Sequence, residues 1–124
     1  MRVLLDTHAA LWWAIDDPRL GRAAGDVIED PANEVLLSAV VVWEVAIKRG
    51  VKKLDAPSDL ALLLLERGVV ALPVTLDHAA AVGRLPDHHR DPFDRLLIAQ
   101  AITEGATLVS RDPAFTDYDV PVVW

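Results

Sequence analysis

Short apolar runs typical of buried strands alternate along the chain with segments that have the length and end signals of helices. Such near-continuous apolar strands, separated by helices, favour a parallel sheet that is covered on both faces. We therefore expect one α/β domain over residues 1–124, a three-layer α/β/α fold whose central, mainly parallel sheet has four to five strands. The strands, some with the turn that follows, are expected at residues 2–5, 34–39, 69–74, 106–112 and 120–124. The helices are expected at residues 7–15, 19–30, 40–50, 58–68, 75–85 and 92–104.

The apolar runs, of which residues 60–65 form one of the longest, are too short to cross a bilayer. A secretory signal is not expected, because Asp6 would lie inside its apolar region. The chain has no cysteine, which leaves no disulfide framework and no thiolate metal site. These features predict a cytoplasmic protein without a membrane segment.

The net charge of −7 argues at first against a nucleic-acid partner, because phosphate groups bind positive surfaces. That objection weakens if several acids converge on one spot, where bound cations neutralise them. The location of the acids in the fold therefore matters more than their sum.

Four acids fall where the ends of parallel strands are expected to meet. Asp6 follows the first strand and Asp112 follows the fourth, whereas Glu44 lies in the helix after the second strand. Asp94 opens the helix that leads into the fourth strand, so it begins at the same edge of the sheet. In open parallel sheets, ligands bind beyond the carboxyl ends of the strands, near the point where the strand order reverses. We expect these four carboxylates to share one site.

Helix capping is the alternative explanation for most of these acids. Asp6 suits the N-cap of the next helix, and Asp91 and Asp112 each precede a proline, which suits a first helical position. For Asp91 the capping role is favoured over a ligand role. Glu44 has no such explanation, since apolar residues flank it in its helix and its charge needs compensation. A cap can also be a ligand, and separate caps do not explain why four acids meet at one edge.

Carboxylates crowded in this way repel one another and raise one another's pKa unless a cation is present. An all-oxygen ligand set without cysteine suits a hard ion such as Mg²⁺ or Mn²⁺, which also binds substrate phosphate. Such an ion orients a phosphodiester, polarises its phosphorus and activates a water molecule. The pattern predicts phosphodiester hydrolysis.

Four stretches, "LLDTHAALWW", "SAVVVWEVAIKRG", "HHRDPFDRLLIAQA" and "LVSRDPAF", together resemble the PIN-domain nucleases, in particular the VapC-type toxins of bacterial toxin–antitoxin pairs. The resemblance covers nearly the whole chain. It implies a PIN-like fold and a metal-dependent endoribonuclease that cuts structured RNA such as tRNA or rRNA. It also implies a homodimer and a hetero-oligomer with a small antitoxin that inhibits it. One departure is that Val40–Val42 are apolar where relatives often have serine or threonine.

The resemblance also implies roles for individual residues. Asp6, Asp94 and Asp112 match ligands that hold Mg²⁺ or Mn²⁺ directly or through water. Glu44 matches the fourth acid, which ligates through water or positions the attacking water. The residues expected to support these four are Thr7, Ser38, Ser110 and Asp91.

Basic residues flank the acids and are candidates to hold RNA phosphates. These are Lys48, Arg90, Arg95 and Arg111. His88 and His89 are expected to be surface or substrate contacts rather than metal ligands, while Lys52 and Lys53 suit a solvated helix end. The adjacent Trp12 and Trp13 point about 100° apart on a helix, so either both belong to the core or one contacts a partner chain.

A catalytically silent module that binds RNA or a peptide in the same groove remains the competing function. It would bind RNA without metal-dependent products. A phosphatase or a phospho-accepting receiver domain is disfavoured, because "DTH" lacks the second acid of an aspartyl-phosphatase motif.

Overall fold

Five strands form a single, fully parallel sheet in the computed structural model, which describes all residues from Met1 to Trp124. The strands are β1 (Arg2–Leu5), β2 (Glu34–Ser38), β3 (Val70–Leu72), β4 (Thr107–Val109) and β5 (Val122–Val123). Their order across the sheet is β3-β2-β1-β4-β5, and every neighbouring pair is parallel. The predicted α/β class with a parallel sheet is confirmed.

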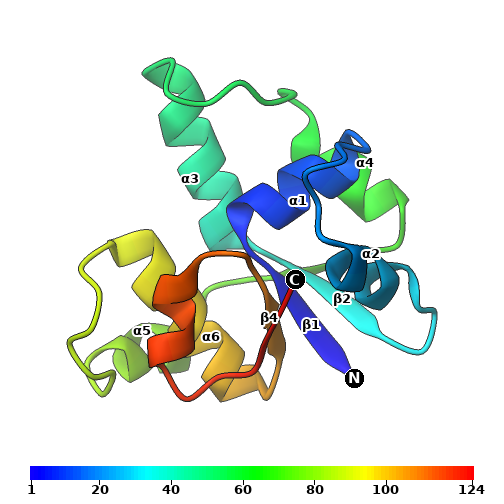
Figure 1. Cartoon of the computed structure of the whole chain (residues 1–124). Coiled ribbons are helices and arrows are strands. Elements are labelled where there is room, and N and C mark those ends of the chain that lie inside the picture. Colours follow the sequence, from blue (N-terminus) through cyan, green and yellow to red (C-terminus); the bar gives the residue numbers. More distant parts are fainter.

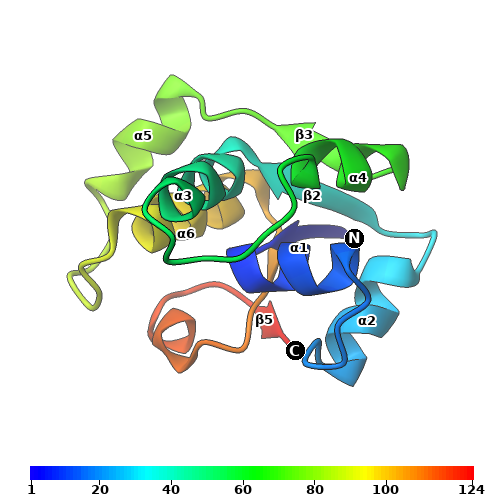
Figure 2. The ribbon, with the colours of Figure 1, turned by 90° about the horizontal axis from the view of Figure 1, so that it is seen from above.

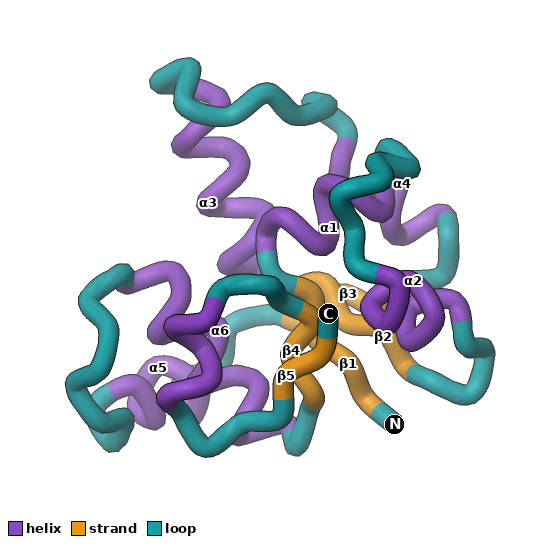
Figure 3. The backbone as a smooth tube through the Cα atoms, in the orientation of Figure 1, coloured by secondary structure: helices purple, strands orange, loops and turns teal.

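Helices lie on both sides of this sheet, which Figure 3 shows at the centre of the molecule. They are α1 (Thr7–Ala14), α2 (Arg22–Glu29), α3 (Ala39–Gly50), α4 (Leu60–Glu66), α5 (Leu76–Val82), α6 (Pro92–Glu104) and the 3₁₀ helix η1 (Pro113–Asp117). In Figure 1, α5 and α6 lie on one side of the strands and α1, α2 and α4 on the other. This division follows from right-handed crossovers. From β1 through β2 to β3 the chain moves across the sheet in one direction, and from β3 to β4 it moves back in the other, so the connecting helices lie on opposite faces. A membrane span would need a longer apolar helix than any found here.

The central strand β1 explains why the core is apolar on both faces. Its residues Val3, Leu4 and Leu5 have no exposed surface, because strands flank β1 on both edges and helices cover both of its faces. They belong to one hydrophobic cluster of 27 buried residues that draws on most elements of the fold.

Several elements are shorter than predicted, and prolines and glycines explain part of the difference. The third strand is limited to Val70–Leu72, since Pro73 has no N–H for the ladder. Gly21 is the N-cap of α2, so that helix begins after the predicted start. Gly105 ends α6 in the left-handed region, at φ 63°, where a residue with a side chain is strained. The helical turn η1 was not predicted as an element, although its cap, Asp112, was considered.

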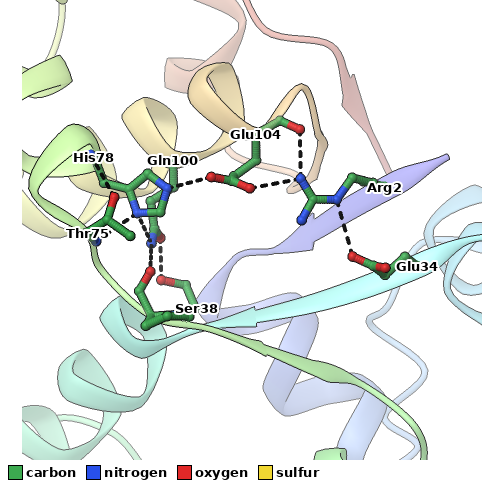
Figure 4. A network of polar contacts seen from close by, with 8 residues as sticks. Arg2, Glu34, Ser38, Thr75, His78, Gln100 and Glu104 are labelled. Carbon is green, nitrogen blue, oxygen red and sulfur yellow. Dashed lines mark hydrogen bonds and ion pairs between the residues drawn. The ribbon is translucent and has the colours of Figure 1, made fainter.

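A continuous chain of polar contacts ties the end of β2 to α5, α6 and the start of β1 (Figure 4). The Ser38 hydroxyl donates to Oε1 of Gln100, whose amide donates to the Pro73 carbonyl at 3.3 Å and to Nδ1 of His78 at 3.2 Å. Nδ1 of His78 therefore accepts, and its Nε2 donates to Glu104 at 2.7 Å. Ser38, His78 and Gln100 are almost fully buried, so their mutual hydrogen bonds replace those that water would supply.

Candidate functional site

The four acids singled out in the sequence line one cleft of about 420 Å³ at the carboxyl ends of the strands. Asp6 directly follows β1, and Asp112 follows β4. These two strands are neighbours at the point where the strand order reverses. Glu44 reaches the cleft from α3 and Asp94 from the first turn of α6. Helix α3 contacts both α1 and α6, and Figure 2 shows these three helices from above. The structure therefore brings together the residues that the strand-end argument placed together.

A larger hollow of about 680 Å³ lies elsewhere, lined by residues 28–35 and 67–70 together with Trp13. It lies where β2 and β3 begin, away from the edge at which ligands bind in sheets of this kind. We therefore treat the acidic cleft as the candidate site.

Three acids of the cleft also cap helices, as the sequence suggested. Oδ1 of Asp6 accepts from the Ala9 amide at 2.8 Å, and Oδ1 of Asp112 accepts from the Ala114 amide at 2.9 Å. Oδ1 of Asp91 accepts from the amides of the residues that begin α6, at 2.9 and 3.2 Å. Each capping interaction engages Oδ1, so capping and a place in the cleft are compatible, and Asp91 has both.

Glu44 is 6% exposed and its charge is compensated within the protein. The Thr7 hydroxyl donates to Oε1 of Glu44, and the Lys48 ammonium pairs with Oε2 from one helical turn further on. The hydrogen bond to Glu44 raises the pKa of Lys48. Thr7 thus supports an acid of the cleft, as predicted, and the cation that buried Glu44 requires is Lys48.

Burial raises the pKa of two carboxylates in the cleft, Asp94 and Asp6. Desolvation raises the pKa of Asp94 to about 6, although the hydrogen bond from His89, at 2.7 Å, opposes the shift. Burial likewise raises the pKa of Asp6, and hydrogen bonds from Ser110 and the Ala9 amide oppose it. The same contact with Asp94 raises the pKa of His89. Burial therefore disfavours the ionised forms of Asp6 and Asp94 in the metal-free cleft.

Ser110 links two of the acids, whereas Ser38 does not reach them. The Ser110 hydroxyl hydrogen-bonds to Asp6 and accepts from the Asp112 amide at 3.1 Å. Ser38 instead caps α3, accepting from the Val40 amide at 3.0 Å, and donates to Gln100. The expectation that Ser38 supports the acids is wrong for this structure, because its hydroxyl is committed to the buried network.

Two of the four candidate phosphate contacts, Lys48 and Arg111, line the cleft, and the other two do not. The Arg95 guanidinium donates to the carbonyls of Val82, Pro86 and His89 at 3.0–3.3 Å, so it pins the loop before α6 and is not free to hold a phosphate. Arg90 is exposed outside the cleft. The expectation is therefore corrected for Arg95, whereas a phosphate contact of Arg90 stays a prediction.

The aromatic and histidine residues near the cleft are arranged in ways that spacing alone did not reveal. Trp12 is 2% exposed and belongs to the core, while Trp13 is partly buried with the Arg67 guanidinium 5.1 Å from its ring centre. His88 packs edge-on against Tyr118 outside the cleft. His8 lines the cleft and was missed, although its position two residues after Asp6, at the start of α1, could have indicated it.

The donor chemistry of the cleft fits a hard divalent cation, since its acids are all carboxylates and two of them have raised pKa values. No group of three or more His, Asp or Glu side chains has metal-binding geometry, however. Lys48 and His89 instead pair with Glu44 and Asp94, as a bound cation would. Ion binding at these residues therefore requires that side chains of the cleft rearrange.

Comparison with known proteins identifies the family. Residues 3–121 match the model of the PIN domain. Ribonuclease VapC22 of Mycobacterium tuberculosis is 34% identical over 98% of this chain and 98% of its own. A chain of VapBC2 from Rickettsia felis, solved bound to a DNA fragment from its promoter, has a TM-score of 0.73 at 19% identity, over 99% of this chain and 98% of its own. VapC20 of M. tuberculosis, described as cleaving the sarcin–ricin loop, has a TM-score of 0.61 at 18% identity, with 93% of each chain covered. The match over most of the chain and the identity to VapC22 show that this protein belongs to the PIN domain family.

Proposed function

We propose that this protein is a Mg²⁺- or Mn²⁺-dependent endoribonuclease, the toxin of a toxin–antitoxin pair. One observation carries the proposal: four carboxylates from four separate segments line a single polar cleft at the carboxyl ends of the strands. The similarity to a curated ribonuclease over nearly the whole chain supports it.

In this proposal Asp6, Asp94 and Asp112 would hold the ion, and Glu44 would help to hold it or would orient the attacking water. Such an ion, when bound, positions the RNA phosphodiester, polarises its phosphorus and lowers the pKa of the attacking water. Thr7 holds the Glu44 carboxylate in place through its hydroxyl. Ser110 does the same for Asp6 and for the turn that carries Asp112.

The proposed substrate is structured RNA, and the proposed partners are a small antitoxin and a second copy of the chain. The description of VapC20 as a toxin that cleaves the sarcin–ricin loop supports the substrate. The solved relatives in VapBC complexes support the antitoxin. Exposed apolar side chains on α3 and α4 offer surface for protein contacts. They include Val42, Trp43, Ile47, Leu62 and Leu65.

Purified protein incubated with structured RNAs tests the activity. We expect cleavage products with Mg²⁺ or Mn²⁺, and none with a chelator, because the clustered acids repel an RNA phosphodiester unless a cation is bound. Re-addition of the metal to the chelated sample should restore cleavage and serves as the control. RNA binding without metal-dependent products would instead identify the catalytically silent module.

The raised pKa of Asp94 predicts a pH-dependent gain in stability for Asp94→Asn in metal-free protein. The pKa of Asp94 lies at about 6 in the fold, above its ordinary value, so the ionised carboxylate is disfavoured in the folded state. The loss of stability from ionising Asp94 is absent below the ordinary pKa of an aspartate, grows as the pH rises, and is complete above pH 6. The free energy of unfolding of Asp94→Asn should therefore exceed that of the wild type by about 2 kcal/mol at pH 7.5.

At pH 4 this advantage should vanish, because wild-type Asp94 is then protonated in the fold. Urea unfolding of both variants at the two pH values, with chelator present, measures the difference. An equal difference at both pH values would contradict the prediction.

A further inference from the structure

One buried ring contacts three charged or titratable side chains beside the acidic cleft. Trp12, in α1, has the Arg111 guanidinium carbon 4.5 Å from its ring centre and that of Arg19 at 4.7 Å. The His8 ring lies 5.1 Å from the same ring, tilted by 44°. Of these three neighbours, His8 and Arg111 line the cleft and Arg19 does not.

The two arginines on Trp12 differ in what else they bind. Arg19 forms two hydrogen bonds with the Asp17 carboxylate, at 3.0 and 2.7 Å. Arg111 is exposed and forms no hydrogen bond or ion pair, although Asp112 is its neighbour in sequence and lines the same cleft. Its planar fork of N–H donors is therefore held by stacking and remains available to a ligand.

We propose that Trp12 is a positioning residue that holds Arg111 and His8 at the rim of the cleft to contact a phosphate of the bound RNA. This inference rests on the proposed function and deepens it. The acids repel a polyanion, so a strand that reaches them needs cationic or hydrogen-bonding groups directly beside them. The guanidinium fork matches phosphate oxygens, and stacking on a buried ring limits the orientations it would otherwise sample.

Trp12 is suited to this role because it is itself fixed. It is 2% exposed, lies within the hydrophobic core, and packs edge-on against Trp124 with ring centres 5.9 Å apart. The ring therefore belongs to the rigid part of the fold, while Arg111 and His8 belong to the exposed rim.

The test measures the affinity of a short labelled RNA at several salt concentrations, in an Asp94→Asn background without cleavage. We expect Arg111→Ala to weaken binding by about tenfold and to lower the slope of log affinity against log salt by about one. Arg19→Ala, which removes the same charge from the same ring, is the matched control and should change affinity less than about twofold.

A double-mutant cycle tests the positioning role of Trp12. Trp12→Leu should weaken binding nearly as much as Arg111→Ala, and the further effect of Arg111→Ala in that background should fall below about threefold. Trp12→Phe, which keeps an aromatic face, should be intermediate and replaces Trp12→Leu if the latter does not fold by circular dichroism. An undiminished effect of Arg111→Ala in the Trp12 variants would overturn the positioning role. No effect of Arg111→Ala in the Asp94→Asn parent would overturn the phosphate contact.

Because binding is measured apart from cleavage, absence of any metal-dependent products from the wild type would instead count against the proposed function.

Discussion

Asp6→Asn and Asp94→Asn are each expected to lower the rate of RNA cleavage by about a thousandfold or more while the protein stays folded. Loss of an ion-binding carboxylate removes several kcal/mol of transition-state stabilisation, and each 1.4 kcal/mol corresponds to a tenfold change in rate. The fold should persist because asparagine caps a helix about as well as aspartate, so the bond from the Ala9 amide to residue 6 is retained. Initial cleavage rates with saturating Mn²⁺, together with thermal unfolding, measure both effects.

Asp77→Asn provides a matched control for Asp94→Asn. Both residues are acids in the first turn of a helix, but Asp77 is exposed at the start of α5 and lies outside the cleft. Its substitution should leave the cleavage rate within about twofold and slightly weaken the interaction with the helix dipole. Unchanged cleavage by the metal-loaded Asp6→Asn and Asp94→Asn double variant would remove the carboxylates from the mechanism.

Gln100→Leu is expected to lower the free energy of unfolding by about 3 kcal/mol. Leucine fills nearly the same volume, so the cost arises from hydrogen bonds rather than from a cavity. Gln100 has no exposed surface, and its loss leaves the buried Ser38 hydroxyl and the buried Nδ1 of His78 without these hydrogen bonds. Each stranded polar group costs about 1–3 kcal/mol. Urea unfolding at pH 7.5 measures the change.

A double-mutant cycle with Ser38→Ala separates this explanation from a packing effect. Removal of both partners should cost less than the sum of the two single changes, because no hydroxyl is then stranded. Ser58→Ala, at an exposed serine, is the control for the substitution itself and should change stability by less than about 0.5 kcal/mol. Strictly additive effects of Ser38→Ala and Gln100→Leu would show that the two side chains do not depend on each other.

The location of the acids was predictable from the sequence because it follows from backbone geometry. Asp6 and Asp112 come after short apolar runs that suit buried strands, and parallel strands end at one edge. Asp91 precedes a proline, and that pair marks the start of α6. Even the compensated charge of Glu44 was foreseen, since a buried carboxylate in an apolar helix requires a partner.

The partners of the polar side chains were not predictable in the same way. Arg95 and Arg111 are both arginines next to an acid in the sequence, yet Arg95 is bound by three carbonyls and Arg111 lies over Trp12. Ser38 ends a strand as Ser110 does, but a glutamine from α6 binds its hydroxyl. These outcomes depend on residues that are up to 99 positions apart in the chain.

The sequence by itself determined the parallel sheet, the order of strands and helices along the chain, and the edge at which the acids meet. Each of these follows from the period of apolar residues, from caps and prolines, and from the handedness of crossovers, which act over a few neighbouring residues or one connection. Only the tertiary structure decided that Lys48 and His89 neutralise two of the acids, that Arg95 is occupied, and that Trp12 supports Arg111. The physical reason is that a side chain's partner is selected by the packing of distant elements, where a difference of one rotamer exchanges one partner for another.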